Sequence, residues 1–121
     1  MLTLPPSVRV YLAAEPVDMR KSFDGLSTAT REVLREDPMT GHLFVFVNRS
    51  ADITKVLFWD RSGWCVIAKR LEKGRFRFPK AAAGAKSVEV EAAELSLLLE
   101  GIDLSAAKRR PRWKGEIRAA A

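Results

Sequence analysis

Residues 43–70 read LFVFVNRSADITKVLFWDRSGWCVIAKR and contain three short apolar runs, 43–47, 53–59 and 64–70. Each run is rich in β-branched and aromatic residues, which favour strands. The polar links between them are long enough for hairpins and too short for helical crossovers. The segment therefore predicts three consecutive strands of an antiparallel meander, with no helix between residues 43 and 70.

The N-terminal third predicts a strand followed by a helix. Residues 8–12 alternate apolar and polar positions between proline breakers, which is typical of a strand. Apolar residues then recur at helical spacing and predict a helix from about 19 to 36, capped by Asp18 and ended by Asp37-Pro38. Gly25 inside this helix suggests close packing against a neighbouring backbone.

The C-terminal part predicts shorter elements. Residues 75–78, Arg-Phe-Arg-Phe, alternate strictly and predict a strand with both arginines on one face. Residues 87–90 are expected to pair briefly with the sheet, and leucines over 92–99 predict a helix that ends near Gly101. The predicted fold class is α+β: a small antiparallel sheet, one longer N-terminal helix packed on it and a short C-terminal helix. We expect one domain over 1–104 and a flexible basic tail over 105–121.

Composition limits the class of protein. The chain has 121 residues, 47% of them hydrophobic and 30% charged, which suits one domain that folds in water. We expect neither secretion nor membrane insertion, because the sequence has no apolar run of the length a spanning helix needs and no leader-like start. One cysteine, Cys65, and one histidine, His42, are too few for a soft-ligand metal site. We predict no metal and no cofactor.

Positive charge is concentrated in two segments of the chain. The net charge is −1 over residues 1–48, +7 over 49–86, −5 over 87–107 and +5 over 108–121. Clustered Lys and Arg are what a polyanion-binding surface requires, because phosphate contacts release counterions. A solvated basic face that keeps the protein soluble is the alternative interpretation.

Catalytic groups are scarce. His42 is interpreted as a surface histidine and Cys65 as a small buried hydrophobic residue. Four aspartates lie near predicted element ends and would in principle bind a divalent ion, as nuclease carboxylates do, but capping and turn roles explain them more simply. They are Asp18, Asp24, Asp52 and Asp60. We therefore predict no catalytic residues and no enzyme activity.

Cations between residues 69 and 77 are the leading candidates for a nucleic-acid-binding site. They are Lys69, Arg70, Lys73, Arg75 and Arg77, interleaved with aromatic residues that would offer stacking faces. Strand alternation would instead send the aromatic residues to the core and leave only an electrostatic patch. A second candidate is the tail, with Lys108, Arg109, Arg110 and Arg112, which would follow a phosphate backbone or an acidic partner, or merely keep the chain soluble.

Several motifs together resemble a known family. They are residues 18–26 (DMRKSFDGL), Gly41-His42-Leu43 with Asn48-Arg49, Trp59-Asp60 with Gly63, and residues 69–76 (KRLEKGRF). Their order and spacing are similar to those of the TnpB accessory proteins of the sixty-six class of bacterial insertion sequences, which are distinct from the RNA-guided nucleases called TnpB. The resemblance covers roughly residues 8–104. It implies a bacterial, cytoplasmic protein that assists transposition beside a separate transposase and has no catalytic triad of its own.

Three hypotheses follow from the residues and the resemblance. The leading one is a small α+β protein that binds DNA, or a transposase–DNA assembly, mainly through phosphates, with the cations of residues 69–77 as primary contacts and Arg20, Lys21 and Arg49 as secondary ones. The second is a protein-interaction adaptor, whose first helix or exposed sheet edge recruits the transposase of the same element. The third is a metal-dependent nuclease. No specific DNA sequence preference is expected, since no recognition helix is predicted.

Overall fold

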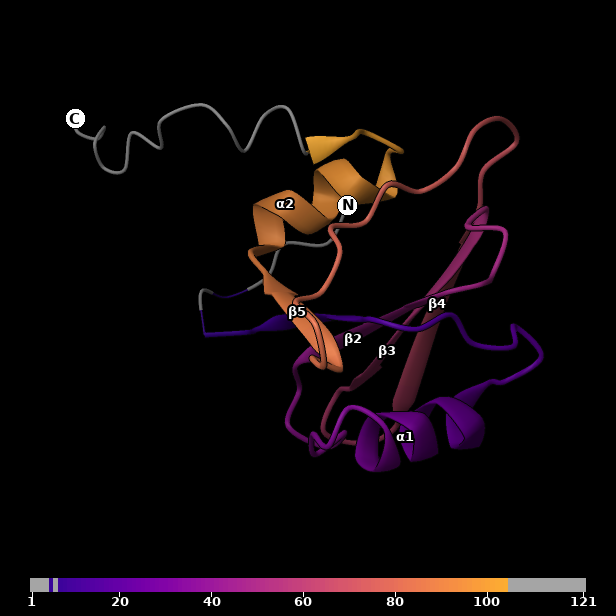
Figure 1. Ribbon diagram of the computed structural model, residues 1–121. Coiled ribbons are helices and arrows are strands. Elements are labelled where there is room, and N and C mark those ends of the chain that lie inside the picture. Colours follow the sequence, from indigo (N-terminus) through magenta and orange to yellow (C-terminus); the bar gives the residue numbers. More distant parts are fainter. Residues whose placement is uncertain (1–4, 6, 105–121) are drawn as a thin grey trace.

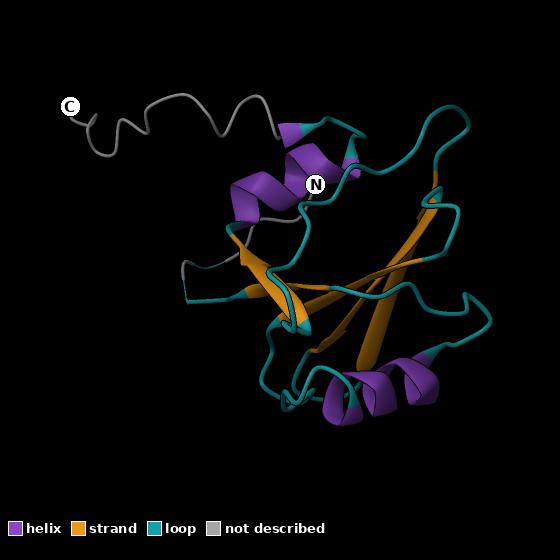
Figure 2. Ribbon diagram, in the orientation of Figure 1, coloured by secondary structure: helices purple, strands orange, loops and turns teal. Residues whose placement is uncertain are grey.

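The computed structural model of the chain describes residue 5 and residues 7–104 (Figures 1 and 2). In chain order the elements are β1 (Val10–Ala13), α1 (Phe23–Glu32), β2 (Leu43–Val47), β3 (Ile53–Trp59), β4 (Trp64–Arg70), β5 (Ser87–Val90) and α2 (Ala92–Leu99). The α+β class and the three strands expected between residues 43 and 70 are confirmed. Neither helix of the described part has the length and apolar character needed to cross a membrane.

The sheet is mixed, where an antiparallel meander was predicted. The strand order is β4-β3-β2-β1-β5, and the meander itself is present as the antiparallel pairs β2–β3 and β3–β4. However, β1 pairs with β2 in parallel, with Tyr11 opposite Phe44, and β5 pairs with β1 antiparallel. The parallel pair arises because α1 lies between β1 and β2 in the chain and provides the crossover that such a pair needs.

One helix covers each face of the sheet (Figure 1). On the α1 face, Leu26 and Ala29 pack with Phe44, Phe46 and Leu57 in one apolar cluster. On the opposite face, the helix α2 contributes to a second buried cluster, made of Val10, Leu12, Leu43, Val45, Val56, Val90, Leu95, Leu98 and Leu104. Because both faces are covered, the central strand β2 is buried at four consecutive positions and reads as a continuous apolar run.

The helix α1 is shorter than the predicted span 19–36 and follows β1, so it is not the N-terminal element of the fold. It begins after Ser22, whose carbonyl accepts the N–H of Leu26 at 2.8 Å, so Asp18 is not its cap. At its end Arg35 adopts a left-handed φ of 59°, and the N–H of Glu36 bonds back to the Thr30 carbonyl. The chain therefore leaves the helical conformation before the expected stop at Asp37-Pro38. The sequence did not indicate this end, because the left-handed residue is an arginine and not the glycine that usually marks such a position.

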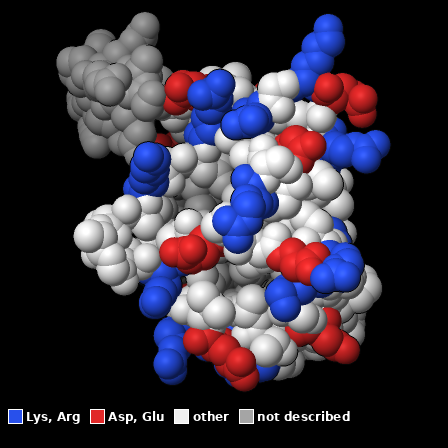
Figure 3. Space-filling view, turned by 45° about the vertical axis from the view of Figure 1, so that its right-hand side comes forward, with Lys and Arg blue, Asp and Glu red and all other residues white. Residues whose placement is uncertain are grey.

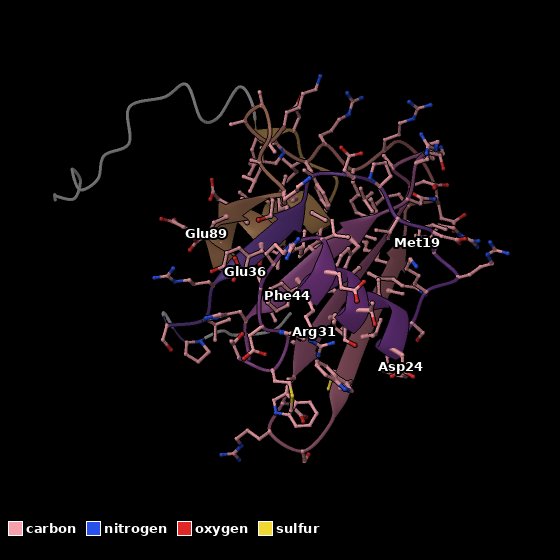
Figure 4. The ribbon with its side chains drawn as sticks, turned by 60° about the horizontal axis from the view of Figure 1, so that its bottom comes forward. Met19, Asp24, Arg31, Glu36, Phe44 and Glu89 are labelled. Atoms are coloured by element: carbon pink, nitrogen blue, oxygen red, sulfur yellow. The ribbon has the colours of Figure 1, made fainter. Side chains whose placement is uncertain are left out.

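The charges at the ends of α1 match the helix dipole. Asp24 lies in the first turn and Arg31 in the last turn. Figure 4 shows these two residues at opposite ends of the helix, with Phe44 on the adjacent sheet. Gly25 packs close to a side chain instead of a neighbouring backbone, because a Cβ placed there would lie 3.0 Å from the Lys21 Cβ.

Candidate nucleic-acid interface

The two cations at the end of β4 lie on opposite faces of the sheet. Lys69 pairs with Thr54 on the α2 face, and its Nζ donates a 2.7 Å hydrogen bond to the Leu99 carbonyl at the end of α2. Arg70 is the next residue of the strand and therefore projects to the α1 face. The predicted cluster 69–77 is consequently not a single surface, since Lys69 holds a helix terminus on the far side from Arg70.

The loop after β4 is fastened to the turn that joins β2 and β3. The Leu71 N–H donates to the Asp52 carbonyl at 2.9 Å, and the Phe76 N–H donates to the Ala51 carbonyl at 2.7 Å. These bonds bring two segments together, residues 48–52 and residues 70–77, which we call the tied turns. Exposed cations surround them: Arg49, Arg70, Lys73, Arg75 and Arg77.

Residues 75–78 do not form the predicted strand. Only the Phe76 N–H bond to Ala51 joins this segment to the meander, so no ladder develops. The alternation has a different cause: Phe76 is buried, Phe78 is half-buried and packs against the core, and both arginines remain exposed. The two phenyl rings lie 5.7 Å apart. These aromatic residues therefore face inward, and the tied turns offer charge without a stacking platform.

The turn 48–52 is held by its own side chains. Hydrogen bonds from Asn48 and Ser50, with a smaller effect from the Arg70 charge, lower the pKa of the Asp52 carboxyl. The Asn48 Oδ1 in turn accepts the N–H groups of Asp52 and Ile53, each at 3.0 Å. Asp52 therefore stabilises the turn that presents Arg49, as the capping interpretation of this aspartate predicts.

The three secondary candidates for phosphate contact differ in whether their side chains already have a partner. The Arg20 guanidinium forms an ion pair with Asp18, in which Nη2 lies 2.6 Å from Oδ2, and lowers the pKa of that carboxyl to about 2. Lys21 is exposed and its stem packs over Gly25. Arg49 is exposed at the tip of the tied turns. Of these three, Arg49 joins the primary cations, whereas Arg20 is already paired.

Positive and negative side chains are interleaved over the face that Figure 3 presents. Lys and Arg do not gather there into one uninterrupted block. The ion pairs Arg20–Asp18 and Arg9–Glu89 involve none of the cations of the tied turns. The tail candidates Lys108, Arg109, Arg110 and Arg112 lie outside the described residues.

The possible catalytic groups have structural partners. Asp60 accepts the N–H groups of Ser62 and Gly63 in the turn between β3 and β4. Cys65 is half-buried with its Sγ 3.6 Å from Asp60 Oδ2, and burial raises the pKa of its thiol. His42 accepts the Arg9 N–H through Nδ1 at 3.0 Å. Within the described ranges no three His, Cys, Asp or Glu residues are placed to hold a metal ion.

Lys55 is a structural residue that sequence reasoning missed. Its Nζ donates 2.8 Å hydrogen bonds to the carbonyls of Met19 and Lys21, which anchors the segment before α1 to the sheet. The lysine interrupts an otherwise apolar strand on the α1 face, and this interruption is the signal that could have identified it.

Together these features define a small α+β protein with one helix on each face of its sheet and with exposed cations around the tied turns. The family described as IS66 Orf2-like protein matches residues 8–109, and the chain belongs to this family. The resemblance to the TnpB accessory proteins of that class of insertion sequences is thus confirmed.

Two relatives come from Sinorhizobium fredii (strain NBRC 101917 / NGR234). The uncharacterized protein y4hO is 44% identical over 103 residues, which cover 85% of this chain and 88% of the relative. The uncharacterized protein y4jC is 38% identical over 104 residues, covering 86% of this chain and 87% of the relative. No solved structure matches the chain.

Proposed function

We propose that the chain is a non-catalytic accessory protein of insertion-sequence transposition that contacts DNA, or a transposase–DNA assembly, through phosphates. The observation that carries the proposal is the pair of hydrogen bonds that fasten residues 71 and 76 to the turn 48–52. They hold cations from two separate segments around one end of the sheet. Membership of the IS66 Orf2-like family supports the transposition role.

The tied turns suit contacts with phosphates better than contacts with bases. Lys and Arg make salt-sensitive contacts with any phosphate, whatever the sequence. Phe76 and Phe78 turn toward the protein. The exposed polar row of α1 includes the carboxylates of Asp24 and Glu32, which phosphates would repel, and α2 carries no cation, so neither helix is suited to the major groove. The proposed binding is therefore weakly specific.

The absence of catalysis is inferred from the roles of the acidic side chains. Asp18 is paired with Arg20, Asp52 belongs to the turn 48–52, and Asp60 belongs to the turn 60–63. Each carboxylate accepts hydrogen bonds that fix a local turn, and the three do not converge on one point. Pure protein with Mg²⁺ or Mn²⁺ should leave labelled element-end DNA intact, and cleavage that disappears in Asp52→Ala would overturn this inference.

Charge reversal at the tied turns tests the DNA-binding proposal. The double variant Arg49→Glu/Arg75→Glu should weaken binding equally for element-end and scrambled duplexes and reduce the slope of log affinity against log salt by about two. The matched control is Arg35→Glu/Arg61→Glu, which removes the same charge from two exposed residues in other turns. Equal losses in both double variants would show a general charge effect and contradict a localised site.

An adaptor role is the second candidate, and exposed apolar side chains on α1 and at its end favour it. Phe23 is 47% exposed and Val33, directly after the helix, is 46% exposed. Such side chains at the surface are suited to a partner's apolar groove. In this case Phe23→Ser/Val33→Ser should abolish capture of the transposase while the salt dependence of DNA binding is unchanged. The opposite pattern favours the DNA-binding role.

A further inference from the structure

The strand β4 is a free edge of the sheet. The pairs Asp52–Leu71 and Asp60–Gly63 are each hydrogen bonded, so the bonds between β3 and β4 fall at odd-numbered residues of β4. The even-numbered residues, Trp64, Val66, Ala68 and Arg70, therefore direct their N–H and C=O groups away from the sheet. In the described part of the chain no strand pairs with this side of β4.

The β4 edge is unprotected over its first five residues, and its two charges, Lys69 and Arg70, lie at the C-terminal end of the strand. Residues 64–68 are Trp-Cys-Val-Ile-Ala, without a charge or a proline, and Ile67 is 41% exposed at the centre of the strand. The opposite edge, β5, has four residues and carries Glu89. Short strands and charged residues are the normal means of protecting an edge, so of these two edges β4, with seven residues and an uncharged stretch over 64–68, is the better suited to pair.

We propose that β4 pairs antiparallel with β4 of a second copy of this chain, joining the two sheets across a two-fold axis at Ile67. Outward backbone groups must meet outward groups, so even residues must face even residues. The register that pairs all seven residues sets Val66 opposite Ala68 and Trp64 opposite Arg70. It sets Ile67 opposite Ile67 in a non-hydrogen-bonded pair, where side chains approach most closely.

Charge complementarity supports a second copy as the occupant. Cys65 faces Lys69 of the second copy, and the Cys65 Sγ lies 3.6 Å from the exposed carboxylate of Asp60. Each Lys69, whose Nζ also bonds to the Leu99 carbonyl of its own chain, thus comes near an acidic group of the second copy. The four cations Lys69 and Arg70 stay apart at the two ends of the pair. On the α1 face Arg70 meets the ring of Trp64, an arrangement that favours a cation–π contact.

The apolar surface beside β4 also fits this occupant. Ile67 lines a hollow between β4 and α2, together with Leu95 and Leu99. In the two-fold register the Ile67 of the second copy lies over the mouth of this hollow. The pairing therefore buries apolar side chains as well as satisfying backbone groups.

The mass of the full chain in solution tests the proposal. Light scattering should give twice the 13.5 kDa of the chain, and Ile67→Lys should weaken the dimer by roughly 100-fold because two like charges then face each other. Ile102→Lys is the matched control, since Ile102 is 44% exposed and lies after α2. Ala68→Pro should also give a monomer, because it removes an outward N–H without breaking a bond to β3.

A monomeric wild type at sub-millimolar concentration would overturn the proposal, as would a dimer that survives both edge variants. Loss of transposase binding in Ile67→Lys, with a monomeric wild type, would assign the edge to a strand of the transposase instead. The register has its own test. In a Cys65→Ser background, Ile67→Cys should form a disulfide between copies when a mild oxidant accepts the electrons, whereas Ile102→Cys should not.

Discussion

At the residue scale, Asn48 does more than its place in a polar link suggests. The sequence predicts a break at 48–52 because mostly polar residues separate two apolar runs, but it does not indicate that one amide organises the turn. The Asn48 Nδ2 donates to Asp52 Oδ1 at 2.8 Å and to Ser50 Oγ at 3.2 Å, while its Oδ1 accepts two backbone N–H groups. All these bonds lie within residues 48–53, so the network is a local turn of the kind that Asn favours, although the residue types alone do not show which side chain organises it.

We expect Asn48→Ala to lower the free energy of unfolding by about 1–3 kcal/mol, because two backbone N–H groups lose their acceptor and the Asp52 carboxylate keeps only the Ser50 hydroxyl of its two side-chain donors. Ser50→Ala removes one exposed hydroxyl from the same turn and should cost less than about 1 kcal/mol. Urea denaturation of both variants measures the difference. If Asn48→Ala were as stable as Ser50→Ala, water would replace the hydrogen bonds of the amide without loss of stability.

The pair Asp18–Arg20 gives a residue-scale prediction about pH. Hydrogen bonds from the Arg20 side chain, and then from its backbone N–H, lower the pKa of Asp18 from 3.8 to about 2. A depressed folded-state pKa stabilises the fold at pH above 3.8, and this stabilisation is lost as the pH falls through about 2. Carboxyl NMR titration should show the pKa of Asp18 rising in Arg20→Gln but returning only part of the way, because the backbone donor remains. Lys21→Gln should change it less.

At the element scale, strands were predicted well where both pattern and turns agreed. The bounds of β2, β3, β4, β5 and α2 match the expected ranges, because each is short and lies between clear polar or glycine boundaries. Alternation alone was insufficient at 75–78. It specifies which side chains face inward but not whether a neighbouring strand offers a free ladder. The parallel β1–β2 pair was missed because alternation contains no information about strand direction.

Lys55 links two elements, and its removal tests how α1 is anchored. Lys55→Met should lower the free energy of unfolding by about 2 kcal/mol, because the Met19 and Lys21 carbonyls lose a charged donor. Hydrogen exchange in α1 should accelerate more than exchange in β2. Lys69→Met is the matched control, since it removes a single bond to the Leu99 carbonyl at the other helix. Faster exchange in α1 for both variants would contradict a local anchor.

At the scale of the whole molecule, the sequence predicted the class of fold and the distribution of charge but not the shape of the site. The sequence showed a net charge of +7 in residues 49–86. In the folded chain these cations lie on both faces of the sheet, and only some of them surround the tied turns. The candidate residue Lys69 has a partner 30 residues away, the Leu99 carbonyl at a helix end, which no linear pattern indicates, whereas Arg20 pairs with Asp18 only two residues before it. Side-chain partners across the fold decide which cations remain available.

The predicted division of the chain into a domain over 1–104 and a basic tail leads to the last prediction. Leu104 is 5% exposed within the core, so a cut that preserves the fold must lie beyond it. A chain ending at residue 107 should keep the wild-type urea midpoint, because it retains every buried side chain described. It loses the net +5 of residues 108–121, so its affinity for element-end and scrambled duplexes should fall equally and the salt slope should decrease. If the tail is an auxiliary arm, this loss of affinity is smaller than the loss caused by Arg49→Glu/Arg75→Glu.

The opposite result would contradict the proposed site. If the truncated chain no longer bound DNA while the charge-reversed chain bound normally, the interface would lie in the tail and the tied turns would have only a structural role.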